Sequence, residues 1–253
     1  MKILTLIPAR LSSSRFPGKP LKKIFKNTMI MEVYNNVKKS TLLKDIYVAT
    51  CDKKIFEHVR QHNGKAIMTS KSHQRASDRC AEALFKIEKK KKIKYDIVLM
   101  VQGDEPLVNQ KMIKQSLQPF KKKKNINVVN LIGKIKESEA ISKDCIKVIK
   151  DNLNNAIYFS RRLIPFNNIK KENYFKQICI IPFKTDFLKK YIKMKPTYLE
   201  KKESIDMLRI LENGYKVNLV ETKEISIPVD RKIDILKVKK HLKKKLNSKN
   251  KKK

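Results

Sequence analysis

Short apolar runs alternate with amphipathic stretches along the first half of the chain. Residues 95–101 (YDIVLMV) are almost continuously apolar, as expected of a central strand that is buried on both faces. Residues 28–38 instead repeat apolar side chains every three or four positions, which is typical of a helix with one buried face. The same reasoning predicts strands over residues 2–7, 46–50, 66–68, 95–101 and 128–135. It predicts helices over residues 28–38, 55–61 and 112–120, with a further helix that Ser77 caps at its amino terminus.

This alternation of strands and helices favours an α/β fold with a doubly wound, mostly parallel sheet. The second half is less regular. A hairpin is expected from residues 146–149 and 156–159, with further strands over 178–183 and 216–221 and helices over 185–192, 203–212 and 233–242. We therefore predict a single domain over residues 1–245, with an inserted lobe at about 135–195 and a disordered basic tail over 246–253.

The chain is strongly basic, with a formal net charge of +37 over 253 residues. The excess is nearly all lysine, because only nine of the 61 Lys and Arg residues are Arg. The lysines lie mostly in short runs without interleaved aromatic rings, which a platform for stacked bases would need. We expect solvated basic faces and no specific nucleic acid, although a nucleic-acid-binding module remains an alternative.

This composition makes the arginines informative, since Lys serves most positions that need only a positive charge. An Arg retained in such a chain indicates a need for its planar guanidinium. For four of the nine, including Arg75 and Arg231, the sequence suggests no role. The four cysteines are widely spaced without a CxxC pair, and no apolar run is long enough for a membrane span. We therefore expect reduced thiols and a cytoplasmic location.

A loop rich in cations follows the first predicted strand. Arg10, Arg15 and Lys19 lie within residues 8–19, together with serine hydroxyls and a Pro-Gly pair that restricts the backbone. These cations would repel one another unless an anion lay between them. Neither a Walker A sequence nor a GxGxxG fingerprint is present. The loop therefore predicts a polyphosphate site of another kind.

Carboxylates follow the central predicted strand. Asp104 and Glu105 come directly after the strand, and Gly103 allows the chain to turn close to a ligand. In open α/β sheets, ligands bind beyond the carboxyl ends of the strands, so this turn should face the cation loop. Hard Mg²⁺ prefers carboxylate oxygens and shares its coordination with substrate phosphates. The pattern predicts a metal–nucleotide site, for which Asp230 is the second acidic candidate.

At this point six segments carry a resemblance to a known family. IPARLSSSRFPGKPL, MTSKSHQRASDRCAEA, VQGDEPLV, IKVIKD, AIYFSR and PVDRKIDI occur in order over almost the whole chain. They resemble the 3-deoxy-manno-octulosonate cytidylyltransferases. The resemblance implies a Rossmann variant of the nucleotide-diphospho-sugar transferase type and a homodimer. It also implies a reaction of CTP with a 2-keto-3-deoxy sugar acid, giving a CMP-sugar and pyrophosphate for lipopolysaccharide or another surface glycan.

The resemblance also implies roles for individual residues. The catalytic residues would be Arg10, Arg15, Lys19 and Asp104. The nucleotide would be bound by these three cations together with Ala9, Ser14, Gln74, Ser77 and Arg79. The sugar acid would be bound by Gln102, Arg161, Gln177 and Asp206. Mg²⁺ would be held by Asp104 and Asp230.

The chain departs from the family pattern mainly on the sugar side. Gln177, Ile181 and Met207 replace a usual His, Tyr and Gln, and Arg75-Ala76 replaces a usual Ser-Gly pair. A different octulosonic or nonulosonic acid is therefore an alternative acceptor. A metal-dependent glycosyltransferase is another alternative, although such enzymes normally place Asp-x-Asp at the strand end, where this chain has Gly-Asp-Glu.

Overall fold

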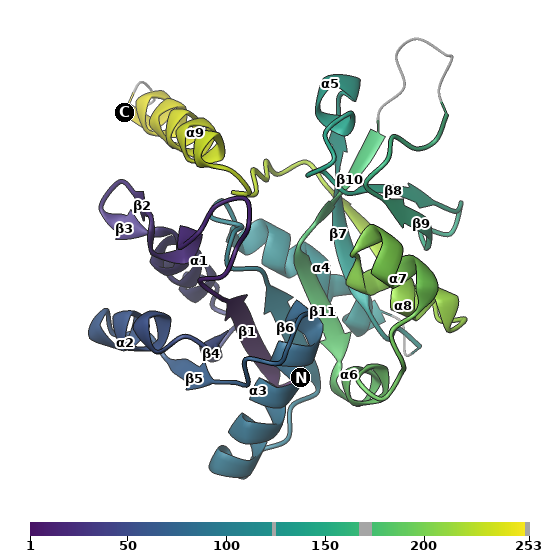
Figure 1. Cartoon of the computed structure of the whole chain (residues 1–253), viewed down its shortest axis with the longest axis horizontal. Helices are drawn as coiled ribbons and strands as arrows, with labels where there is room; N and C mark the ends of the chain where they lie inside the picture. The colour runs from purple at the N-terminus through teal and green to yellow at the C-terminus, as the bar shows by residue number, and fades with distance from the viewer. Residues whose placement is uncertain (123–124, 167–173, 251–253) are drawn as a thin grey trace.

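A computed structural model describes residues 1–122, 125–166 and 174–250 of the chain. The first of two five-stranded sheets has the order β11-β6-β1-β4-β5 (Figure 1). Its strands are β1 (Ile3–Ala9), β4 (Asp45–Thr50), β5 (Ala66–Met68), β6 (Ile97–Val101) and β11 (Ile180–Lys184). Only the edge strand β11 is antiparallel to its neighbour. The mostly parallel sheet predicted from the alternating pattern is therefore confirmed.

Helices cover both faces of this sheet, because successive side chains of a strand point to opposite faces. Leu4 and Leu6 pack in one apolar cluster with residues of α3, whereas Ile3 and Ile7 pack in another with residues of α1 and α4. The helices of this half are α1 (Met29–Lys38), α2 (Lys53–Gln61), α3 (Ala76–Lys91) and α4 (Gln110–Lys122). A one-turn helix η1 (Lys19–Leu21) and the short pair β2 (Lys23–Ile24) and β3 (Asn27–Thr28) precede α1.

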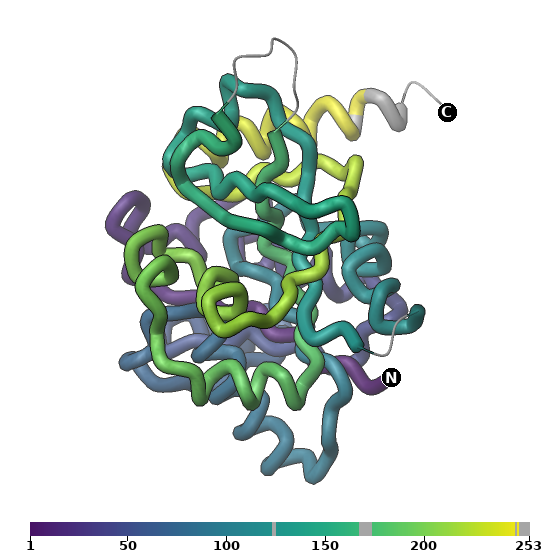
Figure 2. The backbone as a smooth tube through the Cα atoms, turned by 90° about the vertical axis from the view of Figure 1, so that its right-hand side faces the viewer, coloured from purple at the N-terminus to yellow at the C-terminus, as the bar shows by residue number. Residues whose placement is uncertain are grey.

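The second sheet is mixed and has the order β12-β7-β10-β8-β9. Its strands are β7 (Val129–Ile135), β8 (Lys147–Lys150), β9 (Ala156–Ser160), β10 (Tyr174–Ile178) and β12 (Asn218–Thr222). The later helices of the described chain are α5 (Glu137–Ala140), α6 (Thr185–Tyr191), α7 (Tyr198–Glu203), α8 (Asp206–Glu212) and α9 (Lys232–Asn250). Of these, α9 packs beside β2 of the first half (Figure 1). Figure 2 shows the backbone from the side of this second half. None of the helices in the described ranges has the length and apolar character needed to cross a bilayer.

One predicted strand proves to be two. The apolar run 178–183 is divided at Cys179, where the chain leaves the second sheet as β10 and enters the first as β11. A run of apolar residues gives no local signal for such a change, because both strands are buried. Likewise, the helix expected over 203–212 is interrupted between α7 and α8, where Ser204 adopts a left-handed φ of 56°.

The last helix differs from its prediction as well. It was expected over 233–242, but α9 continues to Asn250, into the segment 246–253 for which disorder was predicted. Lysine is a good helix former, so a lysine-rich segment can extend an existing helix. Residues 251–253 of the predicted tail lie outside the described residues. The division into one domain with an inserted lobe at 135–195 remains a prediction.

A buried ion pair joins α7 to α8. The Arg209 guanidinium donates from Nε and Nη2 to the Glu200 carboxylate at 2.7 and 2.6 Å. Glu200 is fully buried and Arg209 is 3% exposed. The guanidinium also lies 4.5 Å from the ring centroid of Tyr191 on α6. Without Arg209, the buried Glu200 carboxylate would keep the longer contact of its Oε1 with Arg75 Nε at 3.4 Å. Loss of the bidentate partner of a buried charge is much more costly than the net value of the pair.

Arg209→Met should therefore lower the free energy of unfolding by about 3 kcal/mol, because Glu200 then stays buried without its bidentate partner. Urea denaturation measures this change. Lys237→Met is the matched control, since Lys237 is 60% exposed in its pair with Asp234. The control should cost less than about 1 kcal/mol. Equal effects of the two substitutions would show that the buried pair does not carry this part of the fold.

Candidate functional site

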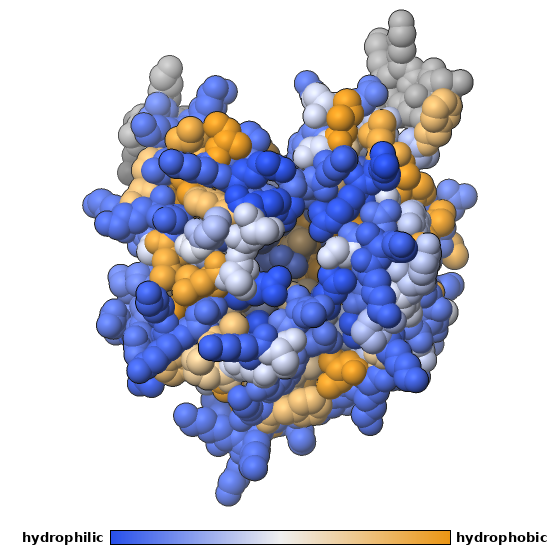
Figure 3. All heavy atoms as spheres, viewed as in Figure 1, coloured by the Kyte–Doolittle hydropathy of each residue, from blue (hydrophilic) through white to orange (hydrophobic). Residues whose placement is uncertain are grey.

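A large cavity lies between the two halves of the molecule, beyond the carboxyl ends of β1 and β6. Its volume is about 1250 Å³, and Figure 3 shows the hollow between the two halves from one side. The strand ends approach closely here, because the Gly103 N–H donates to the Pro8 carbonyl at 3.3 Å. A Cβ at position 103 would lie 3.0 Å from that carbonyl oxygen, so the close approach depends on glycine. The fold thus brings both predicted loops to one cavity.

The loop after β1 is held in a defined shape. Gly18 has a φ of 69°, a conformation that favours glycine, and its N–H donates to the Leu11 carbonyl at 3.0 Å. Phe16 is buried in an apolar cluster with Val229, which lies directly before Asp230. The loop is therefore closed on itself and anchored to the segment that precedes α9.

Lys19 connects the two predicted metal ligands. Its ammonium lies 2.6 Å from Asp104 Oδ2 and 3.8 Å from Asp230 Oδ1, and it also donates to the Val229 carbonyl at 3.0 Å. Burial alone would lower the pKa of Lys19, but the Asp104 and Asp230 carboxylates outweigh it and raise that pKa. Burial and the charge of Asp104 raise the pKa of Asp230. Lys19 therefore stays charged and neutralises the carboxylates on either side of it.

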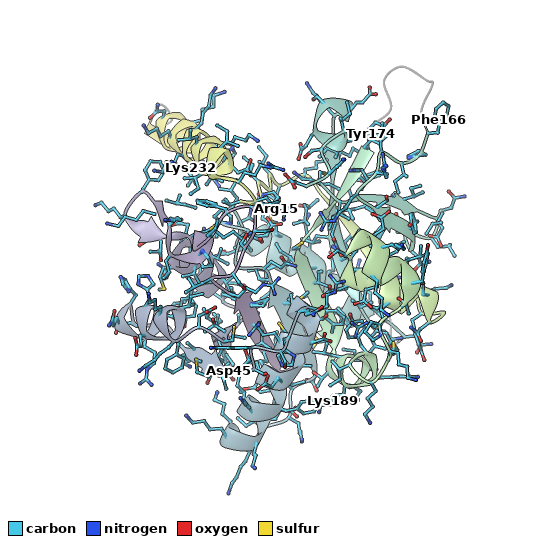
Figure 4. The ribbon with its side chains drawn as sticks, viewed as in Figure 1. Arg15, Asp45, Phe166, Tyr174, Lys189 and Lys232 are labelled. Carbon is cyan, nitrogen blue, oxygen red and sulfur yellow. The ribbon has the colours of Figure 1, made fainter. Side chains whose placement is uncertain are left out.

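Arg15 extends this arrangement toward the second sheet. Its Nη2 donates to Asp230 Oδ1 at 2.6 Å and its Nη1 to Asp144 Oδ1 at 2.5 Å. Figure 4 shows Arg15 on the loop between the two halves of the molecule. Arg10 also lines the cavity, but no carboxylate in the described part of the chain pairs with it. The cavity thus has cations on the side of the loop, and one of them, Arg10, has no counter-charge among the residues that the structure describes.

Glu105, the second acid of the predicted turn, has a structural role. It is 2% exposed and accepts hydrogen bonds from Ser226 Oγ at 2.8 Å and from the Cys179 N–H at 3.2 Å. Burial, followed by the charge of Asp104, raises the pKa of Glu105 to about 7. Its carboxyl group therefore fixes the point where the chain passes from β10 to β11. The two neighbouring acids have different functions, and only Asp104 faces Lys19.

Some residues predicted to bind the nucleotide line the open cavity, whereas Arg79 is engaged by other groups of the protein. Ala9, Ser14 and Gln74 line the cavity with the loop cations. Arg79 also lies at the cavity, but its guanidinium is 3% exposed and donates to Thr69 Oγ1 at 2.5 Å and to the His73 carbonyl at 3.3 Å. It therefore braces the loop before α3, and any contact with a nucleotide stays a prediction.

The prediction that Ser77 caps α3 is wrong. The helix begins at Ala76, and Ser77 is a fully buried residue of its first turn. The cap comes from another segment, because Asp206 Oδ2 accepts from Ser77 Oγ at 2.6 Å and from the Ser77 N–H at 3.3 Å. A carboxylate at a helix amino terminus satisfies a free N–H and interacts favourably with the helix dipole. Asp206, predicted to bind the sugar, is thus also a structural residue.

The other residues predicted for the sugar acid lie around the same cavity. Gln102 lines it, and Gln177 donates from Nε2 to Asn130 Oδ1 at 2.5 Å. Arg161 donates to the carbonyls of Glu203 and Lys143 at 2.9 and 3.1 Å, and no carboxylate in the described residues forms an ion pair with its guanidinium. Ile181 and Met207, the two apolar departures, are buried residues of the same wall. Their place at the cavity agrees with their assignment to the sugar side.

The sequence missed two arginines and one aspartate. Arg75 joins the loop before α3 to the α7–α8 turn, since its Nη1 donates to Ser204 Oγ at 2.7 Å. Arg231 donates from Nε to Asp144 Oδ2 at 2.6 Å. Both arginines line the cavity, although no role could be derived for them. Their retention in a chain dominated by lysine was the available signal. Asp144 had none, because its contacts lie far away in sequence.

The donors at Asp104 and Asp230 suit Mg²⁺. The two carboxylates both contact a positively charged group of the protein itself, the Lys19 ammonium. In the described part of the chain, no group of three or more His, Cys, Asp or Glu side chains could hold an ion. Mg²⁺ is commonly held by one or two carboxylates together with substrate phosphates and water, so two aspartates beside a polyphosphate site are sufficient.

The fold and the site together define an α/β protein of the nucleotidyltransferase class. A sequence model of the Cytidylyltransferase family matches residues 4–225. The 3-deoxy-manno-octulosonate cytidylyltransferase of Fusobacterium nucleatum is 44% identical over 91% of this chain and 92% of its own. The enzyme of that name from Geotalea daltonii is 37% identical over 96% of this chain and 99% of its own. The chain belongs to the cytidylyltransferase family, and within it to the 3-deoxy-manno-octulosonate cytidylyltransferases.

Solved structures agree with this assignment. A CMP:2-keto-3-deoxy-manno-octonic acid synthetase complexed with CTP matches with a TM-score of 0.86 and 31% identity, over 97% of this chain and 100% of its own. A glucose-1-phosphate thymidylyltransferase from Bacillus anthracis matches with a TM-score of 0.67 at 11% identity, over 94% of each chain. This second match shows the fold alone. The family confirms the predicted class of enzyme over the glycosyltransferase and nucleic-acid-binding alternatives.

Asp206→Ala should lower the free energy of unfolding by about 1–2 kcal/mol, because the Ser77 N–H at the start of α3 loses its acceptor. The Ser77 hydroxyl loses the shorter of its two hydrogen bonds and keeps the one to the Tyr191 hydroxyl at 3.2 Å. Thermal and urea denaturation measure the loss. Asp186→Ala is the matched control, since Asp186 is an exposed acid in the first turn of α6. If both variants were equally stable, Asp206 would not be the cap of α3.

Proposed function

We propose that this chain transfers the cytidylyl group of CTP to 3-deoxy-manno-octulosonate (Kdo), with release of pyrophosphate. The observation that carries the proposal is the position of Lys19, on the cation loop and between the Asp104 and Asp230 carboxylates. A site with this composition can bind a triphosphate on one side and a divalent cation on the other. CTP and Kdo are proposed as the substrates because the relatives carry the names of this activity.

The cations of the loop bind and orient the triphosphate. Arg10 has no counter-charge among the described residues, so it is available to a phosphate without breaking an ion pair. Lys19 transfers its hydrogen bonds from the aspartates to phosphate oxygens. The anomeric hydroxyl of the sugar acid then attacks the α-phosphorus, and pyrophosphate leaves in line. Arg15 and Lys19 stabilise the negative charge that develops on the leaving group.

Asp104 and Asp230 would hold Mg²⁺ once Lys19 has moved to the phosphates. The bound ion would supply a Lewis acid for the phosphate oxygens. The backbone ties the two acidic segments together, because the Asp104 carbonyl accepts a hydrogen bond from the Val229 N–H at 2.9 Å.

The acceptor is assigned from the names of the relatives. The buried Ile181 and Met207 give the sugar side an apolar surface that cannot pair with hydroxyl groups. Other polar residues of the same wall are Gln102 and Gln177, and the Gln177 Nε2 already donates to Asn130 Oδ1. A related octulosonic or nonulosonic acid therefore stays as the second acceptor to be tested.

We also propose a homodimer that forms through the second sheet. The edge strand β9 and its neighbouring segments expose Leu153 (71%), Ile157 (58%) and Phe166 (91%), and an exposed apolar patch on a soluble domain marks an interaction site. Sedimentation analysis tests this, and the mass of one subunit at micromolar concentration would count against it. A cytoplasmic location is proposed because CTP is available there.

The direct test is pyrophosphate release with Mg²⁺, each of CTP, UTP and ATP, and a panel of acidic ketoses. Turnover with CTP and Kdo is expected to exceed that of every other pair. Faster pyrophosphate release with a nonulosonic acid than with Kdo would show that the nonulosonic acid is the acceptor. No release with any pair, from a protein shown to be folded, would contradict the proposed reaction.

Asp104→Asn should lower Mg²⁺-dependent turnover at least about 100-fold, because the amide cannot replace a carboxylate beside a cation and phosphates. Steady-state pyrophosphate release measures the loss, and circular dichroism should show an intact fold. Asp186→Asn removes an equal charge from an exposed position outside the cavity and should leave turnover unchanged. Near-normal activity of the Asp104 variant would refute its role.

A further inference from the structure

Asp144 links the second sheet to the phosphate-facing loop. It lies between α5 and β8, and its two carboxylate oxygens accept from different arginines. Oδ1 accepts from Arg15 Nη1 at 2.5 Å, and Oδ2 accepts from Arg231 Nε at 2.6 Å. The Asp144 side chain is 21% exposed and lines the cavity. None of the roles derived above for the reaction uses this residue.

A buried lysine holds the backbone of the loop that carries Asp144. Lys147 is fully buried, and its ammonium donates to the carbonyls of Ser142, Cys145 and Arg161 at 3.0, 2.7 and 2.6 Å. Three hydrogen bonds from one ammonium hold the backbone on either side of Asp144 in place. The carboxylate is thus presented at a fixed position and need not be ordered when a ligand arrives.

Arg15 uses its two terminal nitrogens on different acids. Nη2 is paired with Asp230, a predicted metal ligand, whereas Nη1 is paired with Asp144. Occupation of Asp230 by a cation would release Nη2 and leave Nη1 in place. We propose that Asp144 is a positioning residue for the triphosphate, which holds Arg15 by Nη1 so that Nη2 turns to a phosphate oxygen. This inference rests on the proposed function for the identity of the phosphate ligand.

The Asp144 carboxylate need not repel the phosphates, because Arg231 also neutralises it. Asp144 lies between two guanidinium groups, so the three side chains together keep one positive charge. Arg15 has five N–H donors in a planar fork, and one of them on Asp144 leaves the others available. Lysine is not equivalent here, because its donors all lie on one nitrogen and it lacks the planar fork whose two terminal nitrogens reach two separate acceptors.

The test measures the binding of inorganic tripolyphosphate with Mg²⁺ by titration calorimetry. Asp144→Ala should weaken binding about fivefold, equivalent to about 1 kcal/mol, because Arg15 loses its fixed orientation. Asp144→Asn keeps an acceptor for Nη1 and should stay within about twofold of the unmodified chain. Glu137→Gln is the control, because it removes a negative charge from an exposed position on the same lobe. It should leave the affinity unchanged.

A double-mutant cycle distinguishes positioning from a general structural effect. In the Arg15→Ala background, Asp144→Ala should cause no further loss of affinity, because there is no guanidinium left to orient. An equal loss in both backgrounds would overturn the proposal, as would tighter binding by Asp144→Ala, which would make Asp144 a competitor of the phosphate. Thermal unfolding of each variant confirms that the folded chain is being compared.

The two proposals can fail separately. Tripolyphosphate binding does not require turnover. If the double-mutant cycle gave the expected affinities but the unmodified chain formed no CMP-sugar, only the proposed function would be contradicted. An unchanged tripolyphosphate affinity in Asp144→Ala, together with normal turnover of CTP and Kdo by the unmodified chain, would contradict only the role of Asp144.

Discussion

The site depends on one constraint, the neutralisation of Asp104 and Asp230 by the cations of the loop after β1. The partly buried carboxylates of Asp104 and Asp230 both lie close to the Lys19 ammonium. Without this ammonium the two negative charges would repel each other. Lys19 therefore connects three segments that are distant in sequence: its own loop, the turn after β6 and the segment before α9. A triphosphate and a metal ion could exchange with these groups one charge at a time, without leaving a buried charge unpaired.

The path of the chain between the two sheets supplies the rest of the cavity. β10 and β11 are consecutive but lie in different sheets, and the change of sheet occurs at Cys179, opposite the end of β6. The Glu105 carboxyl group fixes this point through the Cys179 N–H, and Gln102 donates its own N–H to the Cys179 carbonyl at 3.0 Å. The floor of the site is thus formed where the sheets meet, which explains why the residues predicted for the nucleotide and those predicted for the sugar acid line one cavity.

Much of this could be predicted from the sequence, because it depends on local pattern. The strand over 66–68, the loop of residues 8–19 and the acid at Asp104 followed from periodicity, backbone chemistry and charge. What failed depends on contacts between distant segments. Ser77 has the residue type of a cap, but its partner Asp206 is 129 positions away, as Asp144 is from Arg15. No local pattern could show that Glu105 turns into the core while its neighbour faces the cavity.

We propose that the loop cations and the two aspartates bind the same metal–nucleotide complex from opposite sides. Anomalous diffraction from Mn²⁺, used in place of Mg²⁺ in crystals with CTP, tests this most directly. A metal peak is expected in contact with both Asp104 and Asp230, with the triphosphate against Arg10 and Lys19. A triphosphate bound away from these cations, or a metal that contacts neither aspartate, would contradict it.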